Sequence, residues 1–225
     1  MDSVSVVVPA MNEGKTIAEV LRGIAAQKEV NEIIVVDGHS TDNTLEIARQ
    51  TIPSVKIIIQ SGKGKGDALK AGFQAASGDI VVAIDADGSM DPAEIPQFIR
   101  SLRGDYDFAK GSRFLPESGT EDMTLLRRFG NKTFTVLVNI LYGTSYSDCC
   151  YGYFAFKKSA FNAIGVKSDG FEIETEINIR AGKKRLRAVE IPSYERRRLF
   201  GEGHLKALQD GWRILATILK EIYRN

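Results

Sequence analysis

Short apolar runs alternate with helical patterns through the first half of the chain. These runs predict buried strands at residues 3–8, 32–36, 55–59 and 80–84. Hydrophobic residues at i, i+3, i+4 and i+7 over residues 17–24 predict an amphipathic helix. Further helices are expected near residues 41–50, over residues 68–76 after a Gly/Lys loop at 61–66, and from an N-cap at Asp91 to about residue 102.

The second half of the chain is less regular. Strands are predicted at residues 108–109, 151–156 and 186–191. Helices are predicted at residues 125–142, 171–181 and 205–223. The last of these carries Leu208, Trp212, Leu215 and Leu219 on one stripe. The two longest helices, at residues 125–142 and 205–223, both have apolar stripes with basic neighbours. This pattern fits a membrane interface, packing on the core or contact with a second copy.

Strands and helices joined by short connections predict a mainly parallel central sheet with helices on both faces. Because no repeat or linker interrupts the pattern, we expect one α/β domain over residues 1–225, divided into halves at 1–103 and 104–200 and a C-terminal amphipathic helix at 204–223. Ligands of such sheets bind beyond the carboxyl ends of the strands. Polar residues lie at those places, in Asn12-Glu13, in Asp37 to Ser40 and in Asp85-Ala86-Asp87.

Composition narrows the class of protein. The 225 residues are 43% hydrophobic and carry a formal net charge of +1, so no global field recruits nucleic acid or a membrane. The two cysteines are neighbours, Cys149 and Cys150, which favours a reducing compartment over a disulfide framework or a zinc site. No signal peptide and no run of about 18 apolar residues is recognised. We expect a cytoplasmic protein, at most peripheral on the inner face of a membrane, with no nucleic-acid partner.

Asp85-Ala86-Asp87 is the first candidate for chemistry. It directly follows a predicted strand, and two carboxylates one residue apart repel each other unless a cation lies between them. Mg²⁺ typically takes one or two carboxylates together with substrate phosphates, and Mn²⁺ accepts the same oxygens. This position favours a metal-bound diphosphate over the alternative, an acidic turn with a helix cap.

Other polar residues suit a nucleotide. Asp37 ends a strand and has the acceptors for ribose hydroxyls or a base, since Ser40 and Asp42 are better placed to cap the next helix. Glu13 suits ribose as well, or a first helical turn. The loop at residues 61–66, which contains Lys65, is typical of phosphate contact or of a solvated turn, and it is not a P-loop.

Basic residues lie between the last strand and the last helix. Arg196, Arg197 and Arg198 form either a solvated face or a clamp for a diphosphate. Glu174 lies in a run of alternating acidic residues, which favours an amphipathic helix with an exposed acidic face.

Five motifs in order resemble family 2 glycosyltransferases of the A-type fold, and among them the polyprenyl (dolichyl) phosphate mannose and glucose synthases. They are residues 6–13 (VVVPAMNE), 36–42 (VDGHSTD), 85–94 (DADGSMDPAE), 111–114 (GSRF) and Arg198-x-x-Gly201. The resemblance covers nearly the whole chain. It implies a single Rossmann-like domain with a nucleotide-binding first half and an acceptor-binding second half. The serine and lysine that end the family's late motif are Gly203 and His204 here.

The resemblance also implies roles for individual residues. The nucleotide-sugar would contact Pro9, Ala10, Asn12, Glu13, Asp37, Lys65, Asp85, Ala86 and Asp87. Asp85 and Asp87 would hold Mg²⁺ or Mn²⁺, Arg198 would bind the β-phosphate, and Arg113 with Arg127 would face the acceptor phosphate. The catalytic group would be Asp87, Arg198, Arg113 and Glu174.

Enzymes of this family invert the anomeric centre in one displacement, so the expected reaction moves a hexose from GDP-mannose or UDP-glucose to a polyprenyl phosphate. An acceptor phosphate is already an anionic nucleophile, whereas a hydroxyl acceptor needs a base. Glu174 stands roughly where hydroxyl-using relatives carry theirs, so a soluble transferase acting on a hydroxyl is the alternative. A nucleotidyltransferase and a non-catalytic nucleotide-sugar binder are weaker ones. The sequence does not identify the sugar or the oligomeric state.

Overall fold

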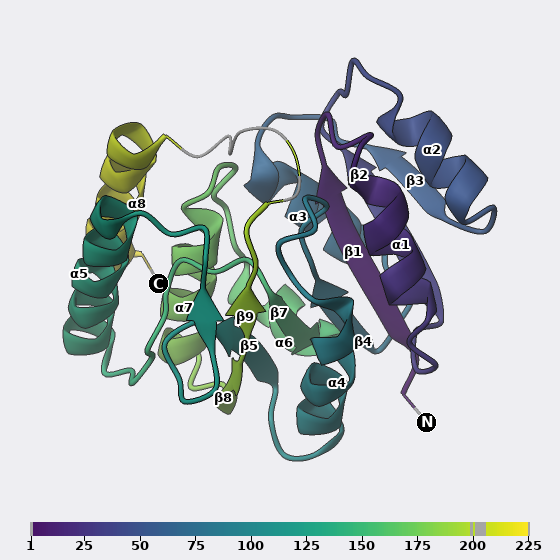
Figure 1. Ribbon diagram of the computed structural model, residues 1–225. Helices are drawn as coiled ribbons and strands as arrows, with labels where there is room; N and C mark the ends of the chain where they lie inside the picture. Colours follow the sequence, from purple (N-terminus) through teal and green to yellow (C-terminus); the bar gives the residue numbers. More distant parts are fainter. Residues whose placement is uncertain (1, 199, 201–205, 225) are drawn as a thin grey trace.

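A seven-stranded sheet forms the centre of the molecule in the computed structural model, which describes residues 2–198, 200 and 206–224 (Figure 1). Its strand order is β3-β2-β1-β4-β7-β5-β8. The strands are β1 (Val4–Ala10), β2 (Glu32–Asp37), β3 (Lys56–Ile59), β4 (Ile80–Ala83), β5 (Phe108–Ser112), β7 (Phe154–Lys157) and β8 (Ala188–Pro192). All neighbouring pairs are parallel except those that β7 makes with β4 and β5. The predicted fold class, a mainly parallel sheet with helices on both faces, is confirmed.

Alternate side chains of the strands build two hydrophobic cores. Val6 and Val8 of β1 face one core, and Val7 between them faces the other, as the two-residue repeat of a strand requires. The first core is covered by α1 (Ile17–Ala25), α2 (Thr44–Thr51) and α4 (Ile95–Arg103). The second is covered by α3 (Lys65–Ala75), α6 (Lys158–Ile164) and α7 (Ile173–Lys183).

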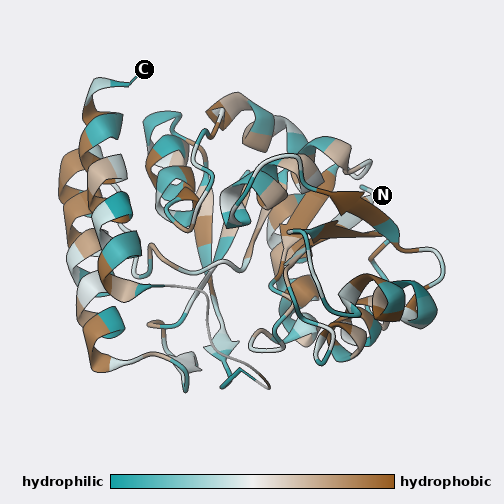
Figure 2. Ribbon diagram, turned by 90° about the horizontal axis from the view of Figure 1, so that it is seen from above, coloured by the Kyte–Doolittle hydropathy of each residue, from teal (hydrophilic) through white to brown (hydrophobic). Residues whose placement is uncertain are grey.

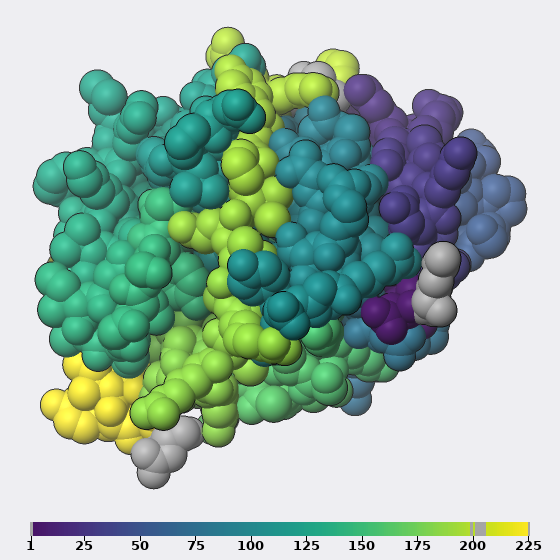
Figure 3. All heavy atoms as spheres, turned by 90° about the horizontal axis from the view of Figure 1, so that it is seen from below, coloured from purple at the N-terminus to yellow at the C-terminus, as the bar shows by residue number. Residues whose placement is uncertain are grey.

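Two long helices form a third layer beside α7. They are α5 (Leu125–Tyr142) and α8 (Ala207–Tyr223), and a small core that includes Val138, Ile179 and Ile214 joins them to α7. In Figure 3, α5 in green and the yellow end of α8 lie at the opposite end of the molecule from the purple N-terminal strand. No helix in the described part of the chain combines the length and hydrophobicity that crossing a membrane requires.

Most predicted elements are present, and several boundaries differ. Lys65, assigned above to a loop, is the first residue of α3, and β5 is longer than its predicted two residues. The helix after Asp91 begins as the 3-10 turn η1 (Pro92–Glu94), whose Ala93 N–H donates to the Asp91 side chain. The helix α6 and the two-stranded ribbon of β6 (Gly119–Thr120) and β9 (Tyr194–Glu195) were not predicted. Gly201, Gly203, His204 and Leu205 lie outside the described residues.

The stripe predicted on the C-terminal helix faces solvent. Leu208 and Trp212 are 76% and 72% exposed, while Ile214 and Ile218 are buried against α5 and α7. Exposed apolar side chains of α5 continue this surface. Figure 2 shows hydrophobic stretches in brown along both helices at the outer edge of the molecule. This apolar stripe is therefore not part of the core.

Candidate functional site

A cavity of about 460 Å³ opens at the carboxyl ends of β1 and β4, where the sheet was expected to bind its ligand. Of the residues predicted to contact the nucleotide-sugar, those lining it are Pro9, Ala10, Glu13, Lys65, Asp85, Ala86 and Asp87. The predicted acceptor residues Arg113 and Arg127 line it too, and so do Glu174 and Arg198. The described structure thus brings most of the predicted site residues together.

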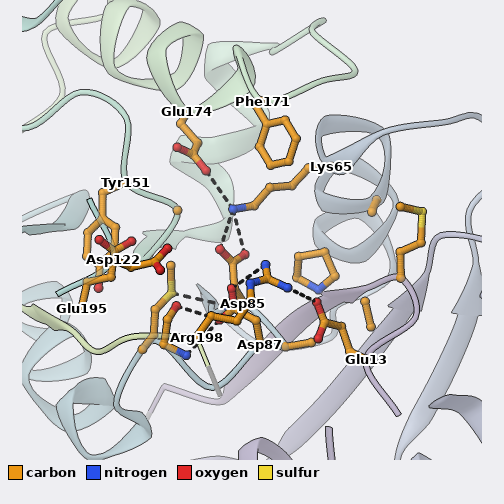
Figure 4. Close-up of a pocket in the computed structure, with 18 of the residues that line it drawn as sticks. Glu13, Lys65, Asp85, Asp87, Asp122, Tyr151, Phe171, Glu174, Glu195 and Arg198 are labelled. Atoms are coloured by element: carbon orange, nitrogen blue, oxygen red, sulfur yellow. Dashed lines mark hydrogen bonds and ion pairs between the residues drawn. The ribbon is translucent and has the colours of Figure 1, made fainter. Parts of the chain in front are cut away.

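Lys65 lies between two carboxylates. Its Nζ is 2.8 Å from both carboxylate oxygens of Asp85 and 2.8 Å from Oε1 of Glu174 (Figure 4). Burial lowers the pKa of Lys65, but attraction by Asp85 and Glu174 outweighs it and holds that pKa above its ordinary value. Lys65 is therefore charged at any physiological pH.

Arg198 makes the corresponding link on the other side of the cavity. Its Nη1 donates to Glu13 Oε1 at 2.9 Å, and its Nη2 is 2.9 Å from Asp87 Oδ2 (Figure 4). The Ser89 backbone N–H and hydroxyl donate to the other oxygen of Asp87. Burial raises the pKa of Glu13, against the opposing effect of Arg198. Residues near the two ends of the chain thus meet in one cluster.

Glu174 is buried, although it was predicted to lie on an exposed face of its helix. The sequence favoured an exposed acidic face for this helix, but Glu174 is only 7% exposed and Glu176 is fully buried. Glu176 accepts from the backbone N–H groups of Lys167 and Ser168, which explains its burial. The expectation of an exposed acidic face is therefore wrong, because both faces of α7 are covered.

Asp37 and Asn12 lie beside the cavity rather than in its wall. Asp37 is 2% exposed, and its Oδ2 accepts from the Ser40 N–H. Within the described residues, Asp37 Oδ1 is buried without a hydrogen-bond partner. Asn12 connects the loops after β1 and β2, since its Oδ1 accepts from the Thr41 N–H.

Arg113 is bound by acidic partners in the floor between the site and α5. Its Nε and Nη2 donate to Asp148, its Nη1 donates to Glu195, and Nη2 also donates to the Cys150 carbonyl. Burial would raise the pKa of Asp148, but Arg113 and Lys110 outweigh it and lower that pKa to about 2. Arg127 is more open, because its side chain is 30% exposed, and its hydrogen bonds and ion pair within the described structure are made with Asp122.

The charge of the cavity suits a divalent cation. The described residues that line it include six carboxylates, on Glu13, Asp85, Asp87, Asp122, Glu174 and Glu195, against four cations, on Lys65, Arg113, Arg127 and Arg198. This leaves an excess of two negative charges. Burial raises the pKa of Asp85 to about 6, and nearby Asp87 and Glu174 add to this effect while Lys65 opposes it. Among the described residues no set of three or more side chains forms a metal cage, but Mg²⁺ needs only one or two carboxylates beside phosphates.

Gly152 is a site residue that the sequence did not reveal. A Cβ at this position would lie 2.3 Å from Lys65 Nζ and 2.8 Å from Glu174 Oε1. Only glycine therefore leaves room for the ion pairs of Lys65. Phe171, Tyr151 and Glu195 also line the cavity without having been predicted. Their sequence neighbours carry no motif, and only the packing of distant segments identifies them.

Several known proteins are similar to this chain in sequence. Residues 5–165 match the family described as Glycosyl transferase family 2. The chain is 30% identical over 226 residues to glycosyltransferase AglJ of Haloferax volcanii, with 100% of this chain and 72% of AglJ covered. It is 32% identical over 228 residues to a dolichol-phosphate mannosyltransferase of Pyrococcus furiosus, with 98% of this chain and 63% of that protein covered. It thus spans less than two thirds of the Pyrococcus protein.

A solved structure supports the fold. Glucosyl-3-phosphoglycerate synthase of Mycobacterium tuberculosis, crystallised with uridine diphosphate, superimposes with a TM-score of 0.78 at 22% sequence identity. The match covers 98% of this chain and 80% of that protein.

Proposed function

The chain belongs to glycosyl transferase family 2, and from this premise we propose that it transfers a hexose from GDP-mannose or UDP-glucose to a polyprenyl phosphate. The observation that carries the proposal is the pair of clusters Glu13–Arg198–Asp87 and Asp85–Lys65–Glu174 at the carboxyl ends of parallel strands. Similarity to the Pyrococcus furiosus dolichol-phosphate mannosyltransferase supports the class of acceptor.

The nucleoside of the donor binds beside the loops after β1 and β2. Asp37 supports this placement, because its Oδ1 is buried, has no partner among the described residues, and can accept from a ribose hydroxyl or a base N–H. Lys65 and Arg198 are the cations nearest to the diphosphate. Since each is already oriented by two carboxylates, little side-chain ordering remains to be done when the donor binds.

Asp85 and Asp87 are the residues that would hold Mg²⁺ or Mn²⁺. Their oxygen donors fit a hard divalent cation, and the excess negative charge of the cavity would be balanced by one. Such an ion, when bound, neutralises charge that develops on the leaving diphosphate. Arg198 contributes to the same task by donating from its guanidinium to the phosphate that departs.

Transfer is a single in-line displacement. An oxygen of the acceptor phosphate forms a bond to the anomeric carbon as the bond from that carbon to the nucleoside diphosphate breaks, which inverts the configuration. No base is required, because the acceptor phosphate is already anionic. Arg127, partly exposed at the cavity wall, binds this phosphate, and Arg113 keeps the adjoining floor in place through Asp148 and Glu195.

Transfer to a hydroxyl acceptor is the second candidate function. The burial of Glu174 within the cavity favours it, since a carboxylate there is placed to take a proton. Against it, Glu174 Oε1 is engaged by Lys65 at 2.8 Å. Transfer to a polyprenyl phosphate needs no proton acceptor, and in that reaction Glu174 positions Lys65.

The test is transfer of labelled hexose into the organic phase. Purified protein is incubated with GDP-mannose or UDP-glucose, Mg²⁺ or Mn²⁺, and either a polyprenyl phosphate or the matching polyprenol. We expect label in the polyprenyl phosphate only, lost with EDTA and in Asp87→Ala, and kept in Asp105→Ala, which changes a surface carboxylate that is 95% exposed. Label in the polyprenol would establish the hydroxyl reaction instead. Release of pyrophosphate would identify a nucleotidyltransferase.

A further inference from the structure

A second cavity of about 290 Å³ lies between the N-terminal parts of α5 and α8. Its apolar wall includes Leu126, Phe134, Leu208, Trp212, Ile214 and Leu215. It shares Arg113, Arg127 and Cys150 with the first cavity, so the two cavities meet at these residues. We call this second cavity the α5–α8 groove.

Two glycines leave space between the helices at the groove. Gly130 of α5 and Gly211 of α8 both face the ring of Phe134, which lies 3.9 Å and 3.8 Å from where their Cβ atoms would be. Further along, the helices close on each other, because the Tyr142 hydroxyl donates to the Ile218 carbonyl and both helices enter the small core beside α7. The groove is therefore open at the end nearest the first cavity and closed at the other.

Of the charged residues described in the groove lining, Arg127 is the most exposed, since Arg113 and Asp210 are only 4% and 5% exposed. Arg127 stands at the junction with the first cavity, and its side chain is 30% exposed. Asp210, which also lines the groove, is matched locally, since it accepts from the Lys206 backbone N–H and contacts Arg213. A ligand that fills both parts must then have an anionic head at Arg127 and a hydrocarbon tail along the helices.

We propose that the α5–α8 groove binds the first part of the hydrocarbon chain of the acceptor lipid phosphate, with the phosphate at Arg127. This proposal rests on the proposed function, because it assigns the tail of the same acceptor. The phosphate then lies at the shared wall, which faces the Lys65 and Arg198 clusters. Each methylene that enters the groove contributes about fourfold to affinity, so acceptors with a longer chain bind more tightly until the groove is full.

Trp212 provides a direct measurement of binding. It is the single tryptophan of the chain, lines the groove and is 72% exposed. Farnesyl phosphate, added below its micelle concentration, is expected to move Trp212 emission to shorter wavelength in a saturable way. Inorganic phosphate should leave the emission unchanged. Farnesol should bind at least tenfold more weakly, because it lacks the charge that Arg127 recognises.

Filling the groove provides the decisive variant. Gly211→Leu places a side chain in the space beside Phe134 without a backbone clash. It should weaken farnesyl phosphate binding tenfold or more. The KM for farnesyl phosphate should rise accordingly, while kcat changes little. Gly130→Leu fills the groove from the other helix and should do the same, which guards against a folding defect of either variant. Leu219→Ala changes an exposed apolar residue of α8 outside the groove and should bind as the wild type does.

The outcomes separate this proposal from the function on which it rests. If both filled variants bind farnesyl phosphate and transfer hexose to it with unchanged KM, the groove proposal is overturned and the function stands. If no polyprenyl phosphate accepts hexose while Trp212 still reports binding that both filled variants abolish, the function fails and the groove remains a lipid-phosphate site. No change of Trp212 emission at any farnesyl phosphate concentration would also overturn the proposal.

Discussion

Lys65 and Arg198 each lie between two carboxylates, and these contacts organise the cavity before any ligand binds. A lysine on a flexible stem is normally costly to order. Here Asp85 and Glu174 hold Lys65 from two sides, so its ammonium already points into the cavity. Gly152, which leaves room for the Lys65 ammonium, is then as important for the position of Lys65 as its two carboxylate partners.

Gly152→Ala is expected to impair transfer strongly. The added methyl would lie 2.3 Å from Lys65 Nζ, so the lysine must move away from Asp85 and Glu174. A displacement of about 1 Å in such a site can cost roughly a hundredfold in rate, and we expect kcat/KM to fall by at least tenfold. Steady-state kinetics and the thermal unfolding temperature are measured together. Normal kinetics in the folded variant would contradict the assigned role of Lys65.

Asp148 makes a pH-dependent contribution to stability. Its pKa is about 2 in the folded protein and about 3.9 in an unfolded chain. A lowered pKa stabilises the fold above the unfolded value, and this stabilisation is lost as the pH falls from about 4 towards 2. Asp148→Asn also leaves Arg113 without its main partner, so it should cost about 3–5 kcal/mol at pH 7.

The pH series tests the assignment. The free energy of unfolding of wild type and of Asp148→Asn is measured with denaturant at pH 7, 5, 4 and 3. The difference between the two should narrow only below about pH 4, and by roughly 2–3 kcal/mol once Asp148 is fully protonated. Asp105→Asn, on an exposed carboxylate, serves as the matched control. A gap that stays constant between pH 5 and pH 3 would show that Asp148 does not titrate as assigned.

At the scale of elements, the sequence predicted the strands of the central sheet well, and it predicted the helix α7 but not the burial of its acidic residues. Runs such as residues 80–84 are buried on both faces, so hydrophobicity alone identifies them. The acidic residues of α7 suggest an exposed face, but Glu174 pairs with Lys65, which is 109 positions away. Glu176 accepts from the backbone N–H groups of Lys167 and Ser168 in the segment just before α7. The two-residue strands β6 and β9 have too few residues to show a period.

A buried ion pair contributes to the docking of α8 on α7. Arg180 of α7 donates from Nη2 to Glu221 Oε1 at 2.8 Å, and Glu221 is 1% exposed. Without Glu221, Arg180 still pairs with Glu176 at 2.8 Å. The cost of Glu221→Ala should therefore be smaller than the roughly 3–5 kcal/mol of leaving a buried charge unpaired, and the thermal unfolding temperature should fall by a few degrees. Lys220→Ala, on the exposed side of the same helix, should leave it nearly unchanged. Equal unfolding temperatures for the two variants would show that the Arg180–Glu221 ion pair does not help to hold α8 in place.

Across the whole molecule, the candidate site is assembled from segments far apart in the chain. Lys65 and Glu174 are 109 positions apart, and Glu13 and Arg198 are 185 apart. The motifs identified Glu13, Asp85, Asp87 and Arg198 individually. Sequence spacing cannot reveal that Glu174 neutralises Lys65 or that Asp148 and Glu195 bind Arg113, because the packing of three layers creates those contacts.

The apolar surface of α5 and α8 gives a final prediction about the molecule's surroundings. Leu125, Phe129 and Ile140 of α5 are 86%, 73% and 74% exposed, and Trp212 of α8 is 72% exposed. Exposed basic side chains on the same helices are Arg128, Lys132, Arg213 and Lys220. Apolar and basic groups together suit the surface of an anionic bilayer, and the proposed acceptor is itself a membrane lipid.

We therefore expect the protein to sediment with vesicles that contain phosphatidylserine, and to do so less with neutral vesicles or at high salt. Phe129→Ser combined with Ile140→Ser should reduce sedimentation at least tenfold, because both side chains lie outside the groove and the donor cavity. Ile59→Ser, at an exposed apolar position on β3, is the matched control and should sediment as the wild type does. A second copy is the competing occupant of this surface. If the double variant converts a dimer to a monomer on size exclusion while vesicle binding is absent throughout, the surface is a dimer interface and the acceptor must reach the groove from solution.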